Sequence, residues 1–95
     1  MRTILYFLTI PGCGACKQAK PAVAAVQKAM PHIEYVEGNI VEMQFPKHSR
    51  WVPQGSPAYA VVREGRNVEV VEGLLTEAEL RNWLLGAPPS GAQIV

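Results

Sequence analysis

The stretch TILYFLTIPGCGACKQAKPAVAAVQKAM, residues 3–30, decides the fold of this chain. Its first eight residues are mostly Ile, Leu, Tyr and Phe without alternation, which is typical of a short strand buried on both faces of a sheet. Pro11 and Gly12 end this strand. Small and apolar residues then recur at spacings of three and four, which predicts a helix from about residue 14 to about residue 30, with Pro21 bending it. We therefore expect a central strand that leads directly into a helix.

The length and the composition describe one small globular domain. The chain has 95 residues and a mass of 10.4 kDa, with 48% hydrophobic and 18% charged residues. A chain this short builds one core only. We expect a single domain over residues 1–86 and a flexible tail over residues 87–95, which contains Pro88-Pro89.

The charge and hydropathy patterns exclude several classes of partner. Nine basic and eight acidic residues leave a formal net charge of +1, too little positive field to bind a nucleic-acid backbone. Ile4 to Leu8 is the longest apolar run near the start, far below the roughly 20 residues that span a bilayer. That run leads into Pro11-Gly12-Cys13 instead of a small-residue cleavage site, so no secretory signal is predicted. We expect a cytoplasmic monomer that binds neither nucleic acid nor membrane.

The rest of the chain predicts a mixed sheet. The other expected elements are a strand at 33–37, a short helix at 40–50, strands at 57–63 and 67–72 joined by a tight connection, and a last helix after Thr76. Thr76 and Glu79 form a capping-box pattern at the start of that helix. The order strand, helix, strand, helix, strand, strand, helix joins a parallel crossover to a hairpin. The predicted fold class is α/β, with a central mixed four-stranded sheet flanked by three helices.

Both cysteines of the chain lie in Cys13-Gly14-Ala15-Cys16, between the first strand and the first helix. A C-x-x-C motif at that position indicates redox chemistry. The first thiol falls at the helix N-terminus, where unpaired amides and the helix dipole stabilise a thiolate, and the second lies one turn further on, within disulfide reach. An ordinary cysteine with a pKa of about 8.5 is only about 3% thiolate at pH 7, whereas a pKa of about 7 gives about half. Cys13 is therefore predicted to attack and Cys16 to resolve.

Two other interpretations of the cysteine pair are weaker. A structural disulfide here would close a ring of four residues, which removes only about 2 kcal/mol of unfolded-state entropy. A zinc site would need further ligands, but His32 and His48 are sixteen positions apart and lack the usual spacing. We expect both histidines in solvated loops and no bound metal.

Three segments resemble the thioredoxin and glutaredoxin superfamily, in the order found there and over roughly residues 2–85. The first is Pro11 to Lys17 with Pro21, which stands where thioredoxins carry a helix-bending proline. The second is Gly55-Ser56-Pro57-Ala58-Tyr59, similar to the loop whose proline is cis and faces the cysteines. The third is Gly65 followed by Gly73-Leu74, similar to the thioredoxin hairpin and to the glycine that lines the substrate groove.

This resemblance implies a thioredoxin-like fold and a thiol–disulfide oxidoreductase that transports electrons to protein disulfides. Cys13 and Cys16 would be the catalytic residues. No cofactor is implied beyond their redox-active disulfide, which would need an external electron donor similar to thioredoxin reductase. Pro57 is expected to be cis, and Pro53 is the competing candidate, but no apolar strand follows it. The substrate-binding residues that the resemblance implies are Gly12, Ser56, Pro57, Gly73 and Leu74.

The sequence departs from thioredoxins near the motif. Gly12 and Ala15 stand where thioredoxins usually carry Trp and Pro. Phe7 replaces their buried Asp, a proton acceptor, and Glu37-Gly38 stands at the strand end where they carry a Lys.

Two alternative functions stay open. A glutathione-dependent glutaredoxin is the alternative enzyme, although Ala15 and Ser56 replace its usual Tyr and Val, and Gly73-Leu74 lacks its Gly-Gly-x-Asp stretch. A non-catalytic adaptor that holds a partner in the same groove is the alternative from another class. Reduction of insulin disulfides separates these functions.

Overall fold

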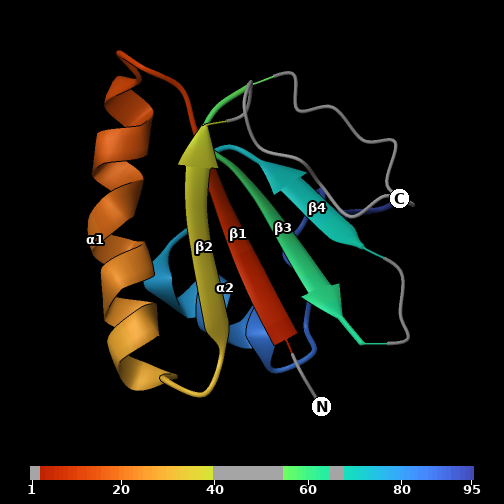
Figure 1. Cartoon of the computed structure of the whole chain (residues 1–95). Helices are drawn as coiled ribbons and strands as arrows, with labels where there is room; N and C mark the ends of the chain where they lie inside the picture. Colours follow the sequence, from red (N-terminus) through yellow and green to blue (C-terminus); the bar gives the residue numbers. More distant parts are fainter. Residues whose placement is uncertain (1–2, 40–54, 65–67) are drawn as a thin grey trace.

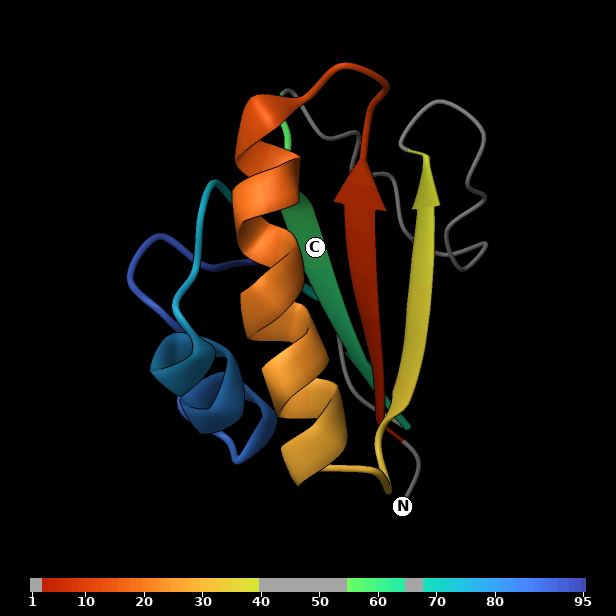
Figure 2. The same ribbon diagram turned by 90° about the vertical axis from the view of Figure 1, so that its left-hand side faces the viewer.

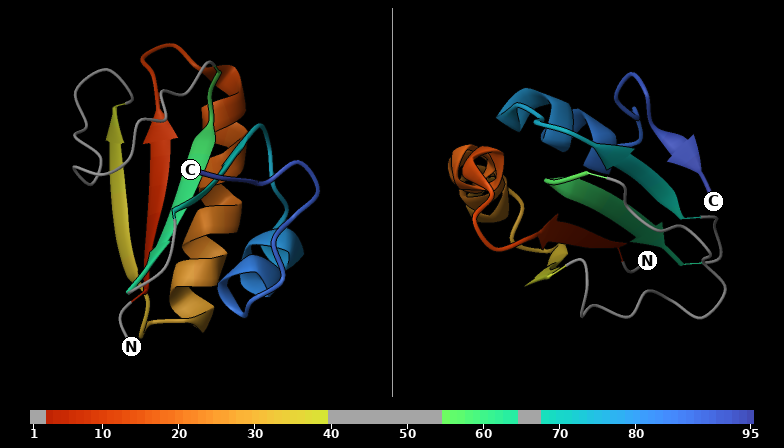
Figure 3. Two further views of the ribbon diagram at one scale, coloured as in Figure 1. Left: turned by 90° about the vertical axis from the view of Figure 1, so that its right-hand side faces the viewer. Right: turned by 90° about the horizontal axis from the view of Figure 1, so that it is seen from above.

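The computed structural model describes residues 3–39, 55–64 and 68–95. Over these residues the chain forms a five-stranded sheet with two helices packed on one of its faces (Figure 1 and Figure 3). The strand order is β2-β1-β3-β4-β5, with β2 parallel to β1 and the other neighbours antiparallel. The elements, in chain order, are β1 (Thr3–Thr9), α1 (Gly14–Ala29), β2 (Glu34–Asn39), β3 (Ala58–Arg63), β4 (Glu69–Glu72), α2 (Glu77–Leu84) and β5 (Gln93–Ile94).

Strand β1 lies inside the sheet because both of its faces are apolar. Leu5 and Phe7 point into the main core, which includes residues of both helices, and Tyr6 packs against a second cluster that contains Ala60 and Val70. Helix α1 crosses from β1 to β2 and returns the chain in parallel, as predicted. Figure 2 shows that β1 and β2 consequently end at the same edge of the sheet, where α1 begins.

The helices follow their sequence patterns. Ala19, Val23 and Val26 form the buried face of α1, at the predicted spacing of three and four. The predicted capping box of α2 is confirmed, because the Thr76 hydroxyl accepts from the Glu79 amide at 3.1 Å and the Glu79 carboxylate accepts from the Thr76 amide at 3.0 Å. Neither helix among the described residues is long and apolar enough to cross a membrane.

A polar cluster joins α2 to the β3–β4 hairpin at the end of the sheet where β3 finishes. The Arg63 guanidinium and the Trp83 indole both donate to one Glu69 oxygen, at 2.5 Å and 2.8 Å. Arg63 also donates to the Trp83 carbonyl. Only 16% of the Arg63 side chain and 20% of the Glu69 side chain are exposed, so little solvent screens this pair. We call Arg63, Glu69 and Trp83 the anchor cluster.

The predicted α/β fold class is confirmed, but the expectation of four strands is wrong. Residues 93–94, which we expected in a tail, form β5 by pairing Ile94 with Glu69 and Gln93 with Val70. Val95 also donates from its amide to the Val68 carbonyl at 2.9 Å. The free edge of β4 offers backbone donors and acceptors to any extended segment, whatever its side chains, so composition did not reveal this strand. The predicted helix at 40–50, Pro53 and His48 lie outside the described residues.

Candidate redox site

A tight loop between β1 and α1 places the first cysteine at the start of the helix. Gly12 has a φ of +77°, a left-handed conformation that glycine adopts without steric cost. Cys13 is the N-cap residue of α1, and its sulfur accepts a hydrogen bond from the Cys16 amide at 3.0 Å. The sulfur thus takes the place of the Ser, Thr or Asp oxygen that commonly caps a helix. The prediction that Cys13 lies at the helix N-terminus is confirmed.

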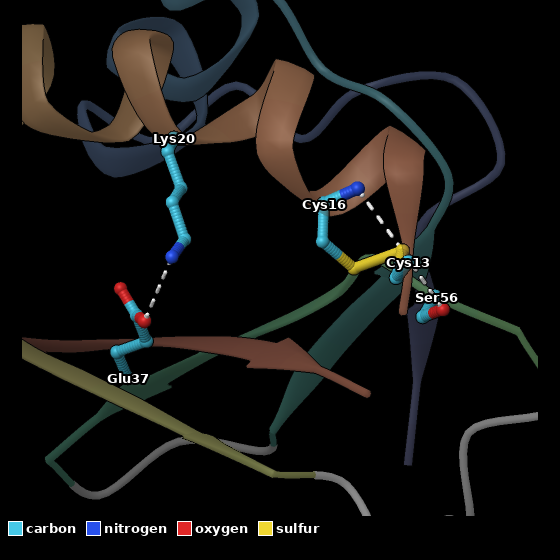
Figure 4. Close-up of a disulfide and its surroundings, with 5 residues drawn as sticks. All are labelled: Cys13, Cys16, Lys20, Glu37 and Ser56. Carbon is cyan, nitrogen blue, oxygen red and sulfur yellow. Dashed lines mark hydrogen bonds and ion pairs between the residues drawn. A yellow bond between two sulfur atoms is a disulfide. The ribbon is translucent and has the colours of Figure 1, made fainter. Parts of the chain in front are cut away.

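Cys13 and Cys16 form a disulfide, with their Cα atoms 5.3 Å apart (Figure 4). The two residues differ in exposure, because Cys16 is 3% exposed whereas Cys13 is only partly buried. A second protein can therefore approach Cys13 more readily than Cys16. This difference supports the assignment of Cys13 as the attacking residue.

The loop before β3 brings the second predicted segment to the cysteines. The Ser56–Pro57 peptide bond is cis, and Pro57 is fully buried. Ala58 pairs with Leu8, so the antiparallel pairing of β3 with β1 carries Ser56 to the edge where α1 begins. There the Ser56 hydroxyl donates to the Cys13 sulfur at 3.3 Å (Figure 4). Ser56 was predicted only as a substrate-binding residue, and the contact of its side chain with Cys13 was missed. The hydroxyl side chain directly before Pro57 was the available signal.

Gly73 and Leu74 of the third predicted segment reach the same edge through β4, whereas Gly65 lies outside the described residues. Gly73 has a φ of +103°, and its amide donates to the Pro57 carbonyl at 2.8 Å. Leu74 follows with 50% of its surface exposed. The structure therefore gathers most of the predicted site residues at one edge of the sheet, with Leu74 beside them. We call this group the redox edge; it consists of Gly12, Cys13, Cys16, Ser56, Pro57 and Gly73.

A hollow of about 180 Å³ adjoins the disulfide. Ile10, which is 41% exposed, contributes an apolar wall. The complete lining is Thr9, Ile10, Gly12, Cys13, Cys16, Lys17 and Lys20. The sequence analysis missed Thr9, Ile10 and Lys20 as site residues. The spacing of four between Cys16 and Lys20 would have placed both on one face of the helix.

An aromatic pair occupies the core where thioredoxins would carry their buried acid. The ring of Phe7 stacks on the ring of Tyr59, with centroids 5.5 Å apart. Burial raises the pKa of Tyr59 to about 12; the backbone of Leu75 acts in the opposite direction, but it lies outside hydrogen-bonding geometry with the hydroxyl. A Lys20–Glu37 pair also lies on this side of the sheet, with Nζ and Oε2 3.9 Å apart (Figure 4).

The described residues contain no group of three or more His, Cys, Asp or Glu side chains placed to hold a metal ion. His32 is exposed in the turn before β2, as expected.

The Cys13–Cys16 pair, with the more exposed cysteine at a helix N-terminus beside the Ser56 hydroxyl, is placed for thiol–disulfide exchange with another molecule. The β-α-β crossover followed by the hairpin and α2 is the frame of a thioredoxin-like fold. The chain is thus a thiol–disulfide oxidoreductase of thioredoxin-like fold.

Comparison with known proteins agrees with this class. No protein-family model matches the chain. It is 24% identical over 89 residues to Thioredoxin H-type 1 of Nicotiana tabacum, which covers 94% of this chain and 70% of that protein. It is 23% identical over 87 residues to a Thioredoxin H-type of Fagopyrum esculentum, which covers 92% of this chain and 74% of that protein. The predicted resemblance to the thioredoxin superfamily is confirmed.

Solved structures support the fold. The Fasciola hepatica thioredoxin has a TM-score of 0.71 at 23% identity, over 88% of this chain and 79% of that chain. A mutant thioredoxin from Halobacterium salinarum has a TM-score of 0.73 at 22% identity, over 92% of this chain and 75% of that chain. The thioredoxin-like fold is therefore confirmed by structure as well as by sequence.

Proposed function

We propose that this oxidoreductase reduces disulfide bonds in other proteins, with Cys13 as the nucleophile and Cys16 as the resolving thiol. One observation carries the proposal: Cys13 is partly exposed, and its sulfur accepts hydrogen bonds from the Cys16 amide and the Ser56 hydroxyl. In the reduced protein, both donors and the dipole of α1 would stabilise a Cys13 thiolate.

The reaction then has two steps. The Cys13 thiolate attacks one sulfur of a substrate disulfide, a mixed disulfide forms, and the other substrate sulfur leaves as a thiolate. Cys16 loses its proton and attacks the Cys13 sulfur, and the second substrate sulfur leaves. The substrate gains two electrons and two protons overall, and the protein is left with the Cys13–Cys16 disulfide.

The substrate would bind as an extended segment across the redox edge. Ser56 and Pro57 offer backbone groups beside the sulfurs, and extended segments pair well with such groups. Gly12 and Gly73 add no side chain, and apart from their chain neighbours no atom of the described residues lies within 4 Å of where a Cβ atom would stand. The groove would then be open, with Leu74 as its main apolar contact, which favours many protein disulfides over one specific partner.

The regeneration step requires an external electron donor, and we propose one similar to thioredoxin reductase. No cofactor other than the Cys13–Cys16 disulfide is part of this mechanism. A reducing compartment such as the cytoplasm would keep the dithiol ready to react. The protein would act there as a monomer.

Reduction of insulin tests the proposal. With dithiothreitol as electron source, we expect the chain to accelerate insulin reduction, and we expect Cys16→Ser to accumulate as a mixed disulfide with insulin chains. Activity that appears only with glutathione would favour the glutaredoxin function. No activity and no trapped complex would favour the adaptor and contradict our proposal.

The reduction potential tests the direction of exchange. Equilibration with glutathione buffers of known ratio gives the potential, because about 30 mV corresponds to about 1.4 kcal/mol for two electrons. The donors to Cys13 favour the reduced form, so we expect a potential less negative than the roughly −270 mV of thioredoxin. A value at or below that figure would contradict the expected effect of these donors.

A further inference from the structure

The hydrogen bonds at Cys13 do not explain how the buried Cys16 thiol would lose its proton. Cys16 is 3% exposed, and burial disfavours the charged form of a thiol. The Cys16 amide and the Ser56 hydroxyl both donate to the Cys13 sulfur. Neither of these donors is therefore directed at the Cys16 sulfur.

Lys20 lies on the same face of α1 as Cys16. Residues four apart on a helix have Cβ atoms about 5–6 Å from each other. Both residues line the hollow beside the disulfide. Figure 4 shows both side chains leaving α1 on the side of the sheet. Lys20 therefore contributes a positive charge to the hollow that Cys16 also lines. Its ammonium group lies toward Glu37 in the oxidised protein (Figure 4).

Glu37 on β2 restricts where the Lys20 side chain can point. Glu37 is the register partner of Phe7, and because paired residues share a face, it projects on the face that α1 covers. Its Oε2 atom lies 3.9 Å from the Lys20 Nζ atom, and 58% of the Lys20 side chain and 56% of the Glu37 side chain are exposed. An ion pair this exposed contributes little to stability. Its effect is to orient the Lys20 side chain from α1 toward β2 (Figure 4).

The other groups that face the hollow do not compete for this role. Lys17 also lines it, but it directly follows Cys16, and adjacent helix positions point in different directions. Lys17 stands instead four residues after Cys13. Thr9 at the end of β1 and Ile10 directly after it line the hollow without charge. Among the residues that the structure describes, Lys20 is the lining cation on the helix face of Cys16.

We propose that Lys20 is a positioning residue for the second step, in which its ammonium group stabilises the Cys16 thiolate. The inference rests on the proposed function, because it needs Cys16 to act as the resolving thiol. The Cys16 proton passes to solvent. The bond between Cys16 and Cys13 forms while the bond from Cys13 to the substrate sulfur breaks, and the substrate leaves as a thiolate.

Stopped-flow reaction of the reduced protein with 4,4′-dipyridyl disulfide separates the two steps. This probe is neutral at pH 7, so lysine substitutions do not alter its electrostatic attraction to the site. Each half of the probe gives an absorbance signal when it is released. The first phase reports attack by Cys13, and the second reports resolution by Cys16. Circular dichroism melts of each variant establish that it folds.

We expect Lys20→Gln to slow the second phase about three- to tenfold at pH 7, the effect of losing one unit charge that acts across a partly solvated hollow. In this variant, the pH profile of the second-phase rate should move to higher pH, and the rate of the first phase should change less than about twofold. Lys20→Arg should restore the second phase. Lys28→Gln, a change of another lysine of α1 that is outside the hollow lining, should alter neither phase.

Four outcomes separate the alternatives. An unchanged second phase in Lys20→Gln, or an equal loss in Lys28→Gln, would overturn the role of Lys20. A loss in Glu37→Gln larger than the loss in Lys20→Gln would assign the effect to the carboxylate as a base and overturn it as well. A wild-type protein that gives the first phase alone would instead overturn Cys16 as the resolving thiol, and with it the proposed function.

Discussion

The redox edge and the anchor cluster lie at opposite ends of β3, and they use polar contacts in different ways. At the anchor cluster, Arg63, Glu69 and Trp83 are largely buried and satisfy one another, so that the hairpin and α2 are joined. At the redox edge, the donors of Cys16 and Ser56 converge on one sulfur of a partly exposed disulfide. The contacts at one end stabilise a fixed structure, and those at the other stabilise a group that changes its charge and its bonds.

The largest effect that this contrast predicts is on activity. Cys13→Ser should lower the rate of insulin reduction by more than about a hundredfold, because a serine hydroxyl is not a nucleophile at neutral pH without a base to activate it. Its thermal stability in the reduced state should stay close to that of the wild type. Rate assays and melts of the reduced proteins measure both quantities. Activity retained above a tenth of the wild-type rate would show that Cys16 can attack substrates itself.

Alkylation tests the same assignment of Cys13 as the attacking cysteine and Cys16 as the resolving cysteine. Iodoacetamide should modify Cys13 before Cys16 in the reduced wild-type protein, because Cys13 is partly exposed and accepts two hydrogen bonds. Peptide mass spectrometry after short exposures gives the order. Faster modification of Cys16 at pH 7 would reverse the roles of the two cysteines.

The next effect concerns stability at the anchor cluster. Glu69→Gln keeps an acceptor for Trp83 but leaves the Arg63 guanidinium without its counter-ion, which should lower the free energy of unfolding by about 2–3 kcal/mol. The rate of Cys13 alkylation should not change. Arg81→Gln is the matched control, because it removes the exposed Arg81–Glu77 pair and should cost at most about 0.5 kcal/mol. Urea titrations measure all three proteins, and equal losses in the two variants would refute the special role of burial.

Tyr59 lies in the core between the two regions, and its raised pKa predicts a smaller effect on the free energy of unfolding at high pH. Burial raises its pKa from 10.0 to about 12, so the folded state keeps the proton that the unfolded state loses. The stability from this group is complete below pH 10 and falls as the pH rises toward 12, by about 1.4 kcal/mol at pH 11. Tyr59→Phe should lack this loss, so the two unfolding curves should diverge between pH 9 and pH 11. Parallel pH dependence of the two proteins would show that Tyr59 ionises normally in the folded state.

The smallest predicted effect returns to the redox edge. Ser56→Ala removes the hydroxyl that donates to the Cys13 sulfur, and a hydrogen bond to a thiolate should change its population about three- to tenfold. Alkylation of Cys13 at pH 7 should slow by that factor, and the two rates should meet at high pH, where both thiols are ionised. Ser56→Thr keeps a hydroxyl and should stay near the wild-type rate. A slower rate in Ser56→Ala that persists at high pH would point to altered access instead of altered ionisation.

The sequence by itself determined the features that depend on neighbouring residues. The apolar run of β1, the break at Gly12 and the buried spacing of α1 are local patterns, and so are the N-cap position of Cys13 and the capping box of α2. Each follows from a backbone preference or a side-chain period within a few residues. The fold class and the two reactive cysteines could be predicted for this reason.

Only the tertiary structure decided which distant side chains meet. Ser56 reaches Cys13 from 43 residues away, and Lys20 meets Glu37 across the gap between a helix and a strand. These contacts depend on the register of β1 with β2 and β3, where a shift of one residue would turn each side chain to the other face. Strand β5 depends in the same way on the free edge of β4. Local propensity does not predict strand register. The side chains that lie near the two sulfurs could therefore be identified only from the paired strands of the structure.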